Sequence, residues 1–529
     1  MATNNESIPP VEDIRRLFDL ADSDGLNDSE RILTSLCKKS FLRLWSQPNV
    51  FTDEGFKNGK ASTRELCDAL VIFGSDIIVF SDKHVTFQTN KDLSVAWGRW
   101  YKRAILESCQ QLHGARSWLQ RFPNRTFLDA KCTRPLPVTV PTDVPVRIHL
   151  VAVTRGSREP ALAFNGGLGS LALDSSIEGD AHLRNPFAVG LPEPSKHFVH
   201  VLDEVSVELL LSELDTAADL LDYLNKREAL LGRRGTLVSA CGEEDLLALY
   251  LGTMNSDESE HVFFNIPDGE GQPDTVLLDT GIYQSLKDKP EYIRKKQADL
   301  ISYEWDKLVD RFLEYGDPSL QSQYVNQTAV ETEQGLRLMA AETRFRRRQL
   351  AEVFIGALRN AAPGERRSRL CPGNVPEETV YVFLVVPKRA DDTYDDYRQY
   401  RLAVLHAYVK TAKLIAPLGT TFVGIAFDNI HKDYRGGSED MFILMQKTWT
   451  IEEMAELESK RREFGLWGDA MEVWRYRQDE FPQADQRIAL ERINEIPTKS
   501  TQSRVVDKKK TANRLKKMQK ASKRKNRKK

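Results

Sequence analysis

The chain has 529 residues, a mass of 60.3 kDa and a formal net charge of −2 at pH 7. At roughly 100 to 200 residues per domain this length predicts several domains. With 41% hydrophobic and 29% charged residues, the composition excludes a wholly disordered chain. No run approaches the ~18 apolar residues of a membrane span, and the opening residues lack a secretory signal pattern. We therefore expect a cytoplasmic protein that has no membrane partner.

The cysteines and the charge distribution carry two further expectations. Six cysteines without CxxC spacing predict free thiols rather than a disulfide framework or a cysteine zinc site. Residues 499–529 hold 15 Lys or Arg side chains and one acid, Asp507, so this segment carries +14 and the rest of the chain −16. Without apolar periodicity it reads as a disordered basic tail that binds a polyanion through phosphate contacts, or else as a solvated tail that aids solubility. The tail residues expected to contact nucleic acid are Lys508, Lys509, Lys510, Lys516 and Lys517.

The order of apolar patterns predicts an α/β multidomain protein. Helical and strand-like segments alternate through much of the chain, while the two ends are polar. The predicted divisions are an N-terminal extension (1–27), a first core (28–155), a mixed α/β extension (156–289), a mainly helical region (290–370), a C-terminal α/β domain (371–497) and the basic tail (498–529).

The first core begins with a helix and a hairpin. A helix is predicted from Asp28 to just before Pro48, because apolar side chains recur there at helical spacing. A glycine-containing loop, 53–62, leads into two β-branched and aromatic runs, 65–73 and 76–83. Their Gly-Ser break predicts a β-hairpin. The remaining predicted elements of this core are a helix over about 94–119 and a strand within 146–156.

Charged residues interrupt the ends of this apolar hairpin. Asp68 lies within the first run, and Asp82 and Lys83 close the second. Charges at such positions are costly if buried, unless a metal or a catalytic role compensates them. The two-residue period of a strand places Lys83 on the same face as Ser81 and Asp82 on the opposite face.

This arrangement resembles the core of the PD-(D/E)XK, or restriction-endonuclease-like, nuclease superfamily, over residues 28–155. The resemblance implies that Asp68 is a metal ligand and that Lys83 is the motif lysine. The motif acid two positions before Lys83 is replaced by Ser81. Some restriction endonucleases of the superfamily take a carboxylate from the following helix instead, which implies Glu107, while a bulged strand would let Asp82 serve. Further candidate members are Glu30, Glu65 and Gln111.

The expected chemistry is hydrolysis of phosphodiester bonds. The resemblance implies Mg²⁺ or Mn²⁺ held by Asp68, Glu107 or Asp82, with Lys83 beside the attacking water. Such nucleases act in defence, restriction or repair. Two other interpretations stay open: the acids end strands at a solvated edge, or the fold has lost its activity and serves as a noncatalytic nucleic-acid-binding or adaptor protein.

A second basic segment and the histidines complete the candidate list. Arg344, Arg346, Arg347 and Arg348 form a basic helix face that is expected to line a nucleic-acid channel. Intramolecular ion pairs with Glu342 or Glu352 explain it equally well. The expected partner is nucleic acid, DNA rather than RNA, with a protein partner or homo-oligomer left open. The histidines lack HxxxH and HExxH spacing, and His197 and His200 are predicted to flank a strand rather than to bind metal.

Overall fold

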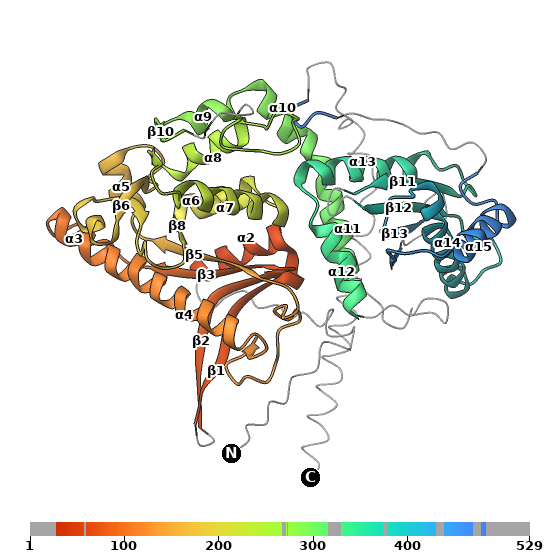
Figure 1. Cartoon of the computed structure of the whole chain (residues 1–529), viewed down its shortest axis with the longest axis horizontal. Helices are drawn as coiled ribbons and strands as arrows, with labels where there is room; N and C mark the ends of the chain where they lie inside the picture. Colours follow the sequence, from red (N-terminus) through yellow and green to blue (C-terminus); the bar gives the residue numbers. More distant parts are fainter. Residues whose placement is uncertain are drawn as a thin grey trace, which may run out of the picture.

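The computed structural model describes residues 28–57, 60–266, 271, 273–315, 329–373, 378–429, 438–468 and 478–482. Within these ranges the protein is a mixed α/β fold with three sheets. Figure 1 shows two of the sheets with their helices in one lobe and the third sheet in a second lobe. The N-terminal extension and the basic tail lie outside the described residues. No helix of the described ranges has the length and apolarity that a membrane span requires.

A six-stranded sheet carries the first core. Its strands are β1 (Ser46–Lys57), β2 (Lys60–Phe73), β3 (Asp76–His84), β4 (Thr126–Phe127), β5 (Arg147–Arg155) and β8 (Val199–Asp203). They lie in the order β4-β1-β2-β3-β5-β8, with β1, β2 and β3 antiparallel and β5 and β8 parallel to β3. The predicted hairpin is confirmed as β2 and β3, which turn at Gly74 with φ of +63°. The loop expected over 53–62 is wrong, because most of that segment pairs as β1 and β2.

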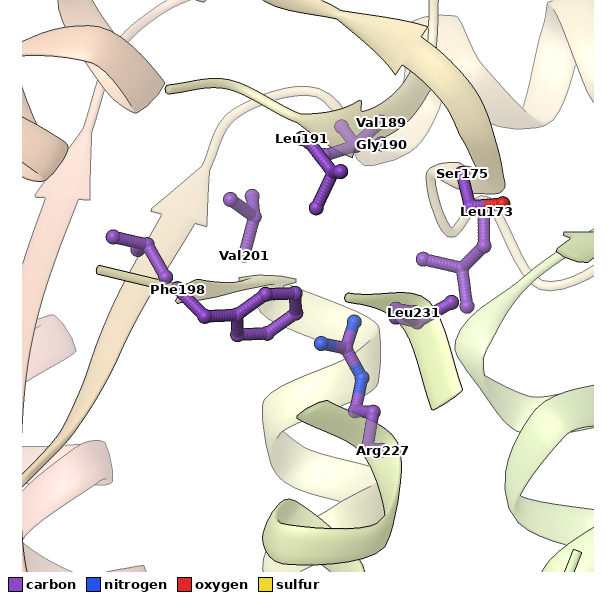
Figure 2. Close-up of a pocket in the computed structure, with 10 residues that line it drawn as sticks. Leu173, Ser175, Val189, Gly190, Leu191, Phe198, Val201, Arg227 and Leu231 are labelled. Carbon is purple, nitrogen blue, oxygen red and sulfur yellow. The ribbon is translucent and has the colours of Figure 1, made fainter. Parts of the chain in front are cut away.

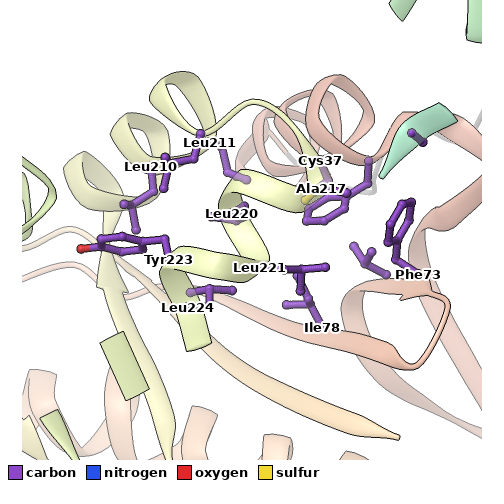
Figure 3. Close-up of a cluster of buried hydrophobic side chains, with 14 of the residues drawn as sticks. Cys37, Phe73, Ile78, Leu210, Leu211, Ala217, Leu220, Leu221, Tyr223 and Leu224 are labelled. Atoms are coloured by element: carbon purple, nitrogen blue, oxygen red, sulfur yellow. The ribbon is translucent and has the colours of Figure 1, made fainter. Parts of the chain in front are cut away.

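Helices cover both faces of this sheet. They are α2 (Asp28–Trp45), α3 (Leu93–Tyr101), a π-helical turn (Lys102–Leu106), α4 (Glu107–Arg121), α6 (Glu204–Glu213) and α7 (Ala217–Leu231). The side chains of β3 alternate, since Ile78 packs into the core with α2, α6 and α7 while Val79 packs into the core with α3 and α4. Figure 3 shows Cys37 of α2 and Ile78 close to Leu221 of α7. The two long helices predicted for this core are therefore confirmed, the second with a π turn inside it.

The sheet extends past the boundary expected at residue 155. Strand β8 comes from the segment after it and pairs with β5. The rest of that segment forms a second sheet in the order β10-β9-β6-β7 and its surrounding helices. Their bounds are α5 (Arg158–Asn165), β6 (Ala172–Glu178), a 3-10 helix (Gly179–Arg184), β7 (Ala188–Leu191), β9 (Leu237–Ala240), α8 (Glu243–Gly252), β10 (Thr275–Leu278), α9 (Ile282–Lys287) and α10 (Pro290–Ala298).

The mainly helical region leads into the third sheet. It comprises a 3-10 helix (Asp299–Ser302), α11 (Tyr303–Tyr315), α12 (Ala329–Ala340) and α13 (Arg344–Asn360). The sheet has the order β11-β12-β13-β14. Its elements are β11 (Arg367–Pro372), β12 (Thr379–Val386), α14 (Tyr394–Ile415), β13 (Thr421–Asp428), β14 (Glu439–Met445) and α15 (Ile451–Glu463). Trp305 of α11 packs edge-on against Tyr381 and Phe383 of β12, which joins the helical region to the third sheet.

Helix α12 packs closely on β14, and two glycines test this contact. A Cβ built on Gly335 of α12 overlaps the buried Cδ1 of Ile443, whereas Gly356 of α13 has open space. Alanine is favoured over glycine inside helices by about 1 kcal/mol at either site. We expect Gly335→Ala to lower the free energy of unfolding by about 1 to 3 kcal/mol and Gly356→Ala to raise it by up to about 1 kcal/mol. Denaturant unfolding measures both, and equal effects would contradict the close packing.

Candidate functional site

Asp68 lies half-buried on β2 with its carboxylate against the backbone of β3. The pairing of Ala69 with Phe80 sets this register, and the Asp82 backbone N–H donates to Asp68 Oδ2 at 2.6 Å. Burial raises the pKa of Asp68 to about 7 against that hydrogen bond, and the charges of Glu65, Asp82 and Glu30 add to the rise. Among the described residues no basic side chain pairs with Asp68. Its charged form is therefore poorly compensated by the protein.

Asp82 does not join this group, which corrects its expected role as a catalytic residue or metal ligand. Its side chain is fully buried on the opposite face of β3, as the strand period predicts. Arg155 of β5 holds it in a forked contact, from Nε to Oδ1 and from Nη2 to Oδ2, each at 2.9 Å. Both carboxylate oxygens are thus engaged by the guanidinium. Asp82 contributes a buried ion pair and the backbone donor to Asp68.

Lys83 and Glu107 are brought together from β3 and α4. The Lys83 Nζ lies 3.4 Å from Glu107 Oε2, with side chains that are 27% and 56% exposed. Glu107 is the first residue of α4 and directly follows the π-helical turn. A solvated pair of this kind contributes only about 0 to 1 kcal/mol. Either side chain can therefore exchange its partner for a ligand.

The position two residues before Lys83 is covered by α4. Ser81 is fully buried on the Lys83 face of β3, and its Oγ donates to Gln111 Oε1 at 3.1 Å. The Ser108 Oγ lies 3.4 Å away. Ser81 is thus a hydrogen-bonded core residue, and the exposed acid on this face comes from α4 as Glu107.

Two more acids approach from α2 and β2. The Asn49 Nδ2 donates to Glu30 Oε2 at 3.1 Å and to Glu65 Oε1 at 3.2 Å, so one amide joins both carboxylates. Burial raises the pKa of Glu65, although the Asn49 hydrogen bond opposes the shift. The three carboxylates expected to share one ion, those of Asp68, Asp82 and Glu107, do not form a group within 4.8 Å of one another in the described part of the chain. Asp82 is turned toward Arg155, and the acids whose charges act on Asp68 are Glu65, Asp82 and Glu30, whereas Glu107 contacts Lys83.

A pocket of about 370 Å³ lies beside this site, between the β1–β2 hairpin and α4. Glu65 and Gln111 line it, together with Arg64, Trp118 and Arg121. Sequence reasoning missed these last three residues, because it assigned the hairpin to a loop and Trp118 to the apolar helix face. The strand-like alternation of residues 64–73, continued toward the N-terminus, could have predicted the longer strand β2.

The predicted nucleic-acid channel on α13 is wrong for three of its four arginines. Arg344, Arg347 and Arg348 are 6%, 1% and 2% exposed. They form intramolecular ion pairs, but with acids distant in sequence rather than with the expected Glu342 or Glu352. The contacts are Arg344–Asp215 at 2.9 Å, Arg344–Asp306 at 2.8 Å, Arg347–Asp306 at 2.6 Å and Arg348–Asp299 at 3.1 Å.

Of the other six residues expected to bind phosphate, the structure describes only Arg346. Arg346 is half-buried, with Nε 4.0 Å from the Glu342 carboxylate. The tail lysines Lys508, Lys509, Lys510, Lys516 and Lys517 lie outside the described residues. The chain matches no protein-family model, no curated protein and no solved structure. The chemistry of the site must therefore be inferred from its geometry.

Proposed function

We propose that the protein is a metal-dependent nuclease whose centre comprises Asp68, Lys83 and Glu107. The observation that carries the proposal is the convergence of Lys83 and Glu107, 3.4 Å apart, on the face of the sheet that holds Ser81. Lys83 stands near the carboxyl end of β3, which runs parallel to β5, and ligands of such sheets bind at these ends. The resemblance implies a helix, a two-stranded hairpin, a second helix and a returning strand; α2, the β2–β3 hairpin, α4 and β5 follow each other in that order, with β1 as an additional strand before the hairpin.

The acids around Asp68 suit a hard cation. Asp68 and Glu107 would hold Mg²⁺ or Mn²⁺, which supplies charge neutralisation at a phosphate and acidifies water. Burial, and then the charges of neighbouring acids, raise the pKa of Asp68, and a cation beside the carboxylate would offset both. The Lys83 ammonium would bind a non-bridging phosphate oxygen and orient the attacking water. Glu107, whose side chain is 56% exposed, would leave Lys83 and bind the metal ion instead.

The neighbouring pocket suits a nucleic-acid strand. Arg64 and Arg121 offer guanidinium groups for phosphates, and Trp118 offers an aromatic face for a base. The Arg125 guanidinium already covers Trp118 at 5.2 Å from the ring centroid and is anchored by Asp53 at 2.9 Å. These residues favour nucleic acid over a small phosphodiester, with DNA as the first substrate to test.

Cleavage by the full-length protein tests the proposal. Plasmid, linear DNA and RNA are incubated with Mg²⁺, with Mn²⁺ and with chelator. We expect Lys83→Met to reduce the cleavage rate by about 10² to 10⁴, because it removes the group that contacts the phosphate and water. Glu107→Gln should cause a loss of similar size, whereas Lys307→Met, at an exposed lysine of α11, should leave the rate unchanged.

The result that overturns the proposal is nucleic-acid binding without cleavage under any divalent ion. That outcome would favour the second candidate function, a noncatalytic nucleic-acid-binding protein. The observation in its favour is that Ser81 stands where the motif has an acid, and that it is buried beneath α4, so this position offers no carboxylate to a metal ion.

A further inference from the structure

Two histidines and a glutamate meet between the first sheet and α7. His149 lies on β5 and His200 on the adjacent parallel strand β8, and Glu228 reaches them from α7. The Glu228 Oε2 is 3.9 Å from His149 Nδ1 and 3.9 Å from His200 Nε2. All three ligand atoms lie within 4.8 Å of one another.

Both imidazole rings are buried without hydrogen bonds at these nitrogens. Their side chains are 0% exposed, and neither ring nitrogen of His149, nor Nε2 of His200, has a hydrogen-bond partner among the described residues. Buried polar atoms in native proteins are nearly always satisfied, so unpaired atoms that point at one place indicate a missing ligand.

We propose that His149, His200 and Glu228 form a binding site for one divalent transition-metal ion of the zinc class. Two imidazole nitrogens and one carboxylate are a ligand set that Zn²⁺ prefers, with bonds of about 2.0 to 2.2 Å. Such bonds place ligand atoms about 3.4 Å apart, so the observed spacing closes with small side-chain movements. The Asp76 Oδ1 lies 3.8 Å from His149 Nε2, close enough that a small movement would let it accept the ring N–H and orient the ligating histidine.

An ion can reach this site through Glu228. The Glu228 side chain is 32% exposed and lines a pocket of about 480 Å³ together with His197 and Gly232. Three protein ligands leave a fourth position for water. The glutamate therefore links the buried histidines to solvent and provides the entry path that a metal site needs.

Arg227 opposes the ion. Its Nη1 lies 3.3 Å from His200 Nδ1, and an ion on Nε2 puts the ring proton on Nδ1, facing the guanidinium. The Arg227 charge is balanced by Glu243, through contacts of 2.7 and 2.8 Å. Figure 2 shows the guanidinium directed toward a cavity bordered by Phe198 and Leu231. This cavity of about 10 Å³ has room for about one water and lets Nη1 move away from the ring.

Metal titration of the full-length, tag-free protein tests the site. Chelator-treated protein is titrated with Zn²⁺ against a chromogenic chelator, and with Co²⁺ by its visible absorption. We expect one tight site in the wild type and in Asp68→Asn, which keeps this test independent of the nuclease centre. Glu228→Gln and His149→Ala should weaken Zn²⁺ binding at least ~100-fold. His113→Ala, a matched control at a histidine paired with Glu193, should bind as the wild type does.

Two results would overturn the inference. One is the absence of a stoichiometric Zn²⁺ site in the wild type, and the other is a site whose affinity is the same in Glu228→Gln. The glutamine variant keeps the shape of a partly exposed side chain, so circular dichroism should show wild-type folding and loss of metal can be assigned to the lost ligand.

Discussion

Replacing Asp68 with Asn is expected to abolish metal-dependent cleavage and, at the same time, to stabilise the protein at pH 8. The side-chain amide oxygen of the variant would still accept the hydrogen bond from the Asp82 backbone, which now reaches Asp68 Oδ2 at 2.6 Å. The substitution removes a charge that burial and neighbouring acids disfavour. A rise of the pKa from 3.8 to about 7 corresponds to about 2 to 4 kcal/mol of free energy of unfolding, recovered in the variant.

The pH dependence fixes the sign of this effect. The folded protein holds the Asp68 proton more tightly than the unfolded chain does, because the folded pKa is about 7. The contribution of Asp68 to stability is therefore full below pH 4 and is lost as pH rises toward 7. At a limiting Mg²⁺ concentration, the cleavage rate should decrease as the pH is lowered below 7, because the protonated Asp68 carboxyl does not bind Mg²⁺.

Unfolding by urea at pH 5 and pH 8 measures the stability change. The wild type and Asp68→Asn should differ more at pH 8 than at pH 5. Asp82→Asn is the matched control on the paired strand, and it should destabilise the protein, because it weakens the buried contact with Arg155. Equal stability of wild type and Asp68→Asn at pH 8 would contradict the uncompensated charge.

Replacing Arg344 with Ala is expected to lower the free energy of unfolding by about 3 to 5 kcal/mol. The guanidinium touches Asp215 at 2.9 Å and Asp306 at 2.8 Å, and the variant would leave these acids with fewer partners in the interior. Its Nη2 also donates to the Asp215 backbone carbonyl at 2.9 Å. This one side chain therefore connects the α6–α7 turn to α11 and α13.

The same variant separates a structural role from nucleic-acid binding. Because Arg344 is buried, its loss should leave the salt dependence of nucleic-acid affinity unchanged under conditions where the variant is folded. Arg99→Ala, at an exposed arginine of α3, is the control for stability and should change it by less than about 0.5 kcal/mol. Deletion of 499–529 is the positive control for the salt slope. A reduced slope in Arg344→Ala would restore the channel interpretation.

Local patterns predicted the elements that carry the candidate site. The two apolar runs around Gly74 have a clear strand period, which also placed Lys83 and Asp82 on opposite faces. The polar, glycine-containing segment 53–62 concealed a strand pair, because it extends beyond the residues that pair with β4 and β3 and so needs few apolar side chains.

Long-range partners could not be predicted from local patterns. The acids that pair with the buried α13 arginines lie about 40 to 130 residues away in the sequence, as Asp306 and Asp215 show. His149 and His200 look like isolated polar positions in two strands until the pairing of β5 with β8 makes them neighbours. The sequence shows which segments are charged. Whether those charges bind a ligand or form internal ion pairs depends on which opposite charges the fold brings beside them.

The π-helical turn Lys102–Leu106 determines the direction in which the Glu107 side chain points. Such a turn holds one residue more than an α-helical turn, so everything after it is rotated by about 100° relative to an unbroken helix. Trp97 and Trp100 anchor the preceding helix in the core, so the rotation falls on α4. In an unbroken helix the Glu107 side chain would face about 100° away from its present direction, so the π turn accounts for its contact with Lys83 at 3.4 Å.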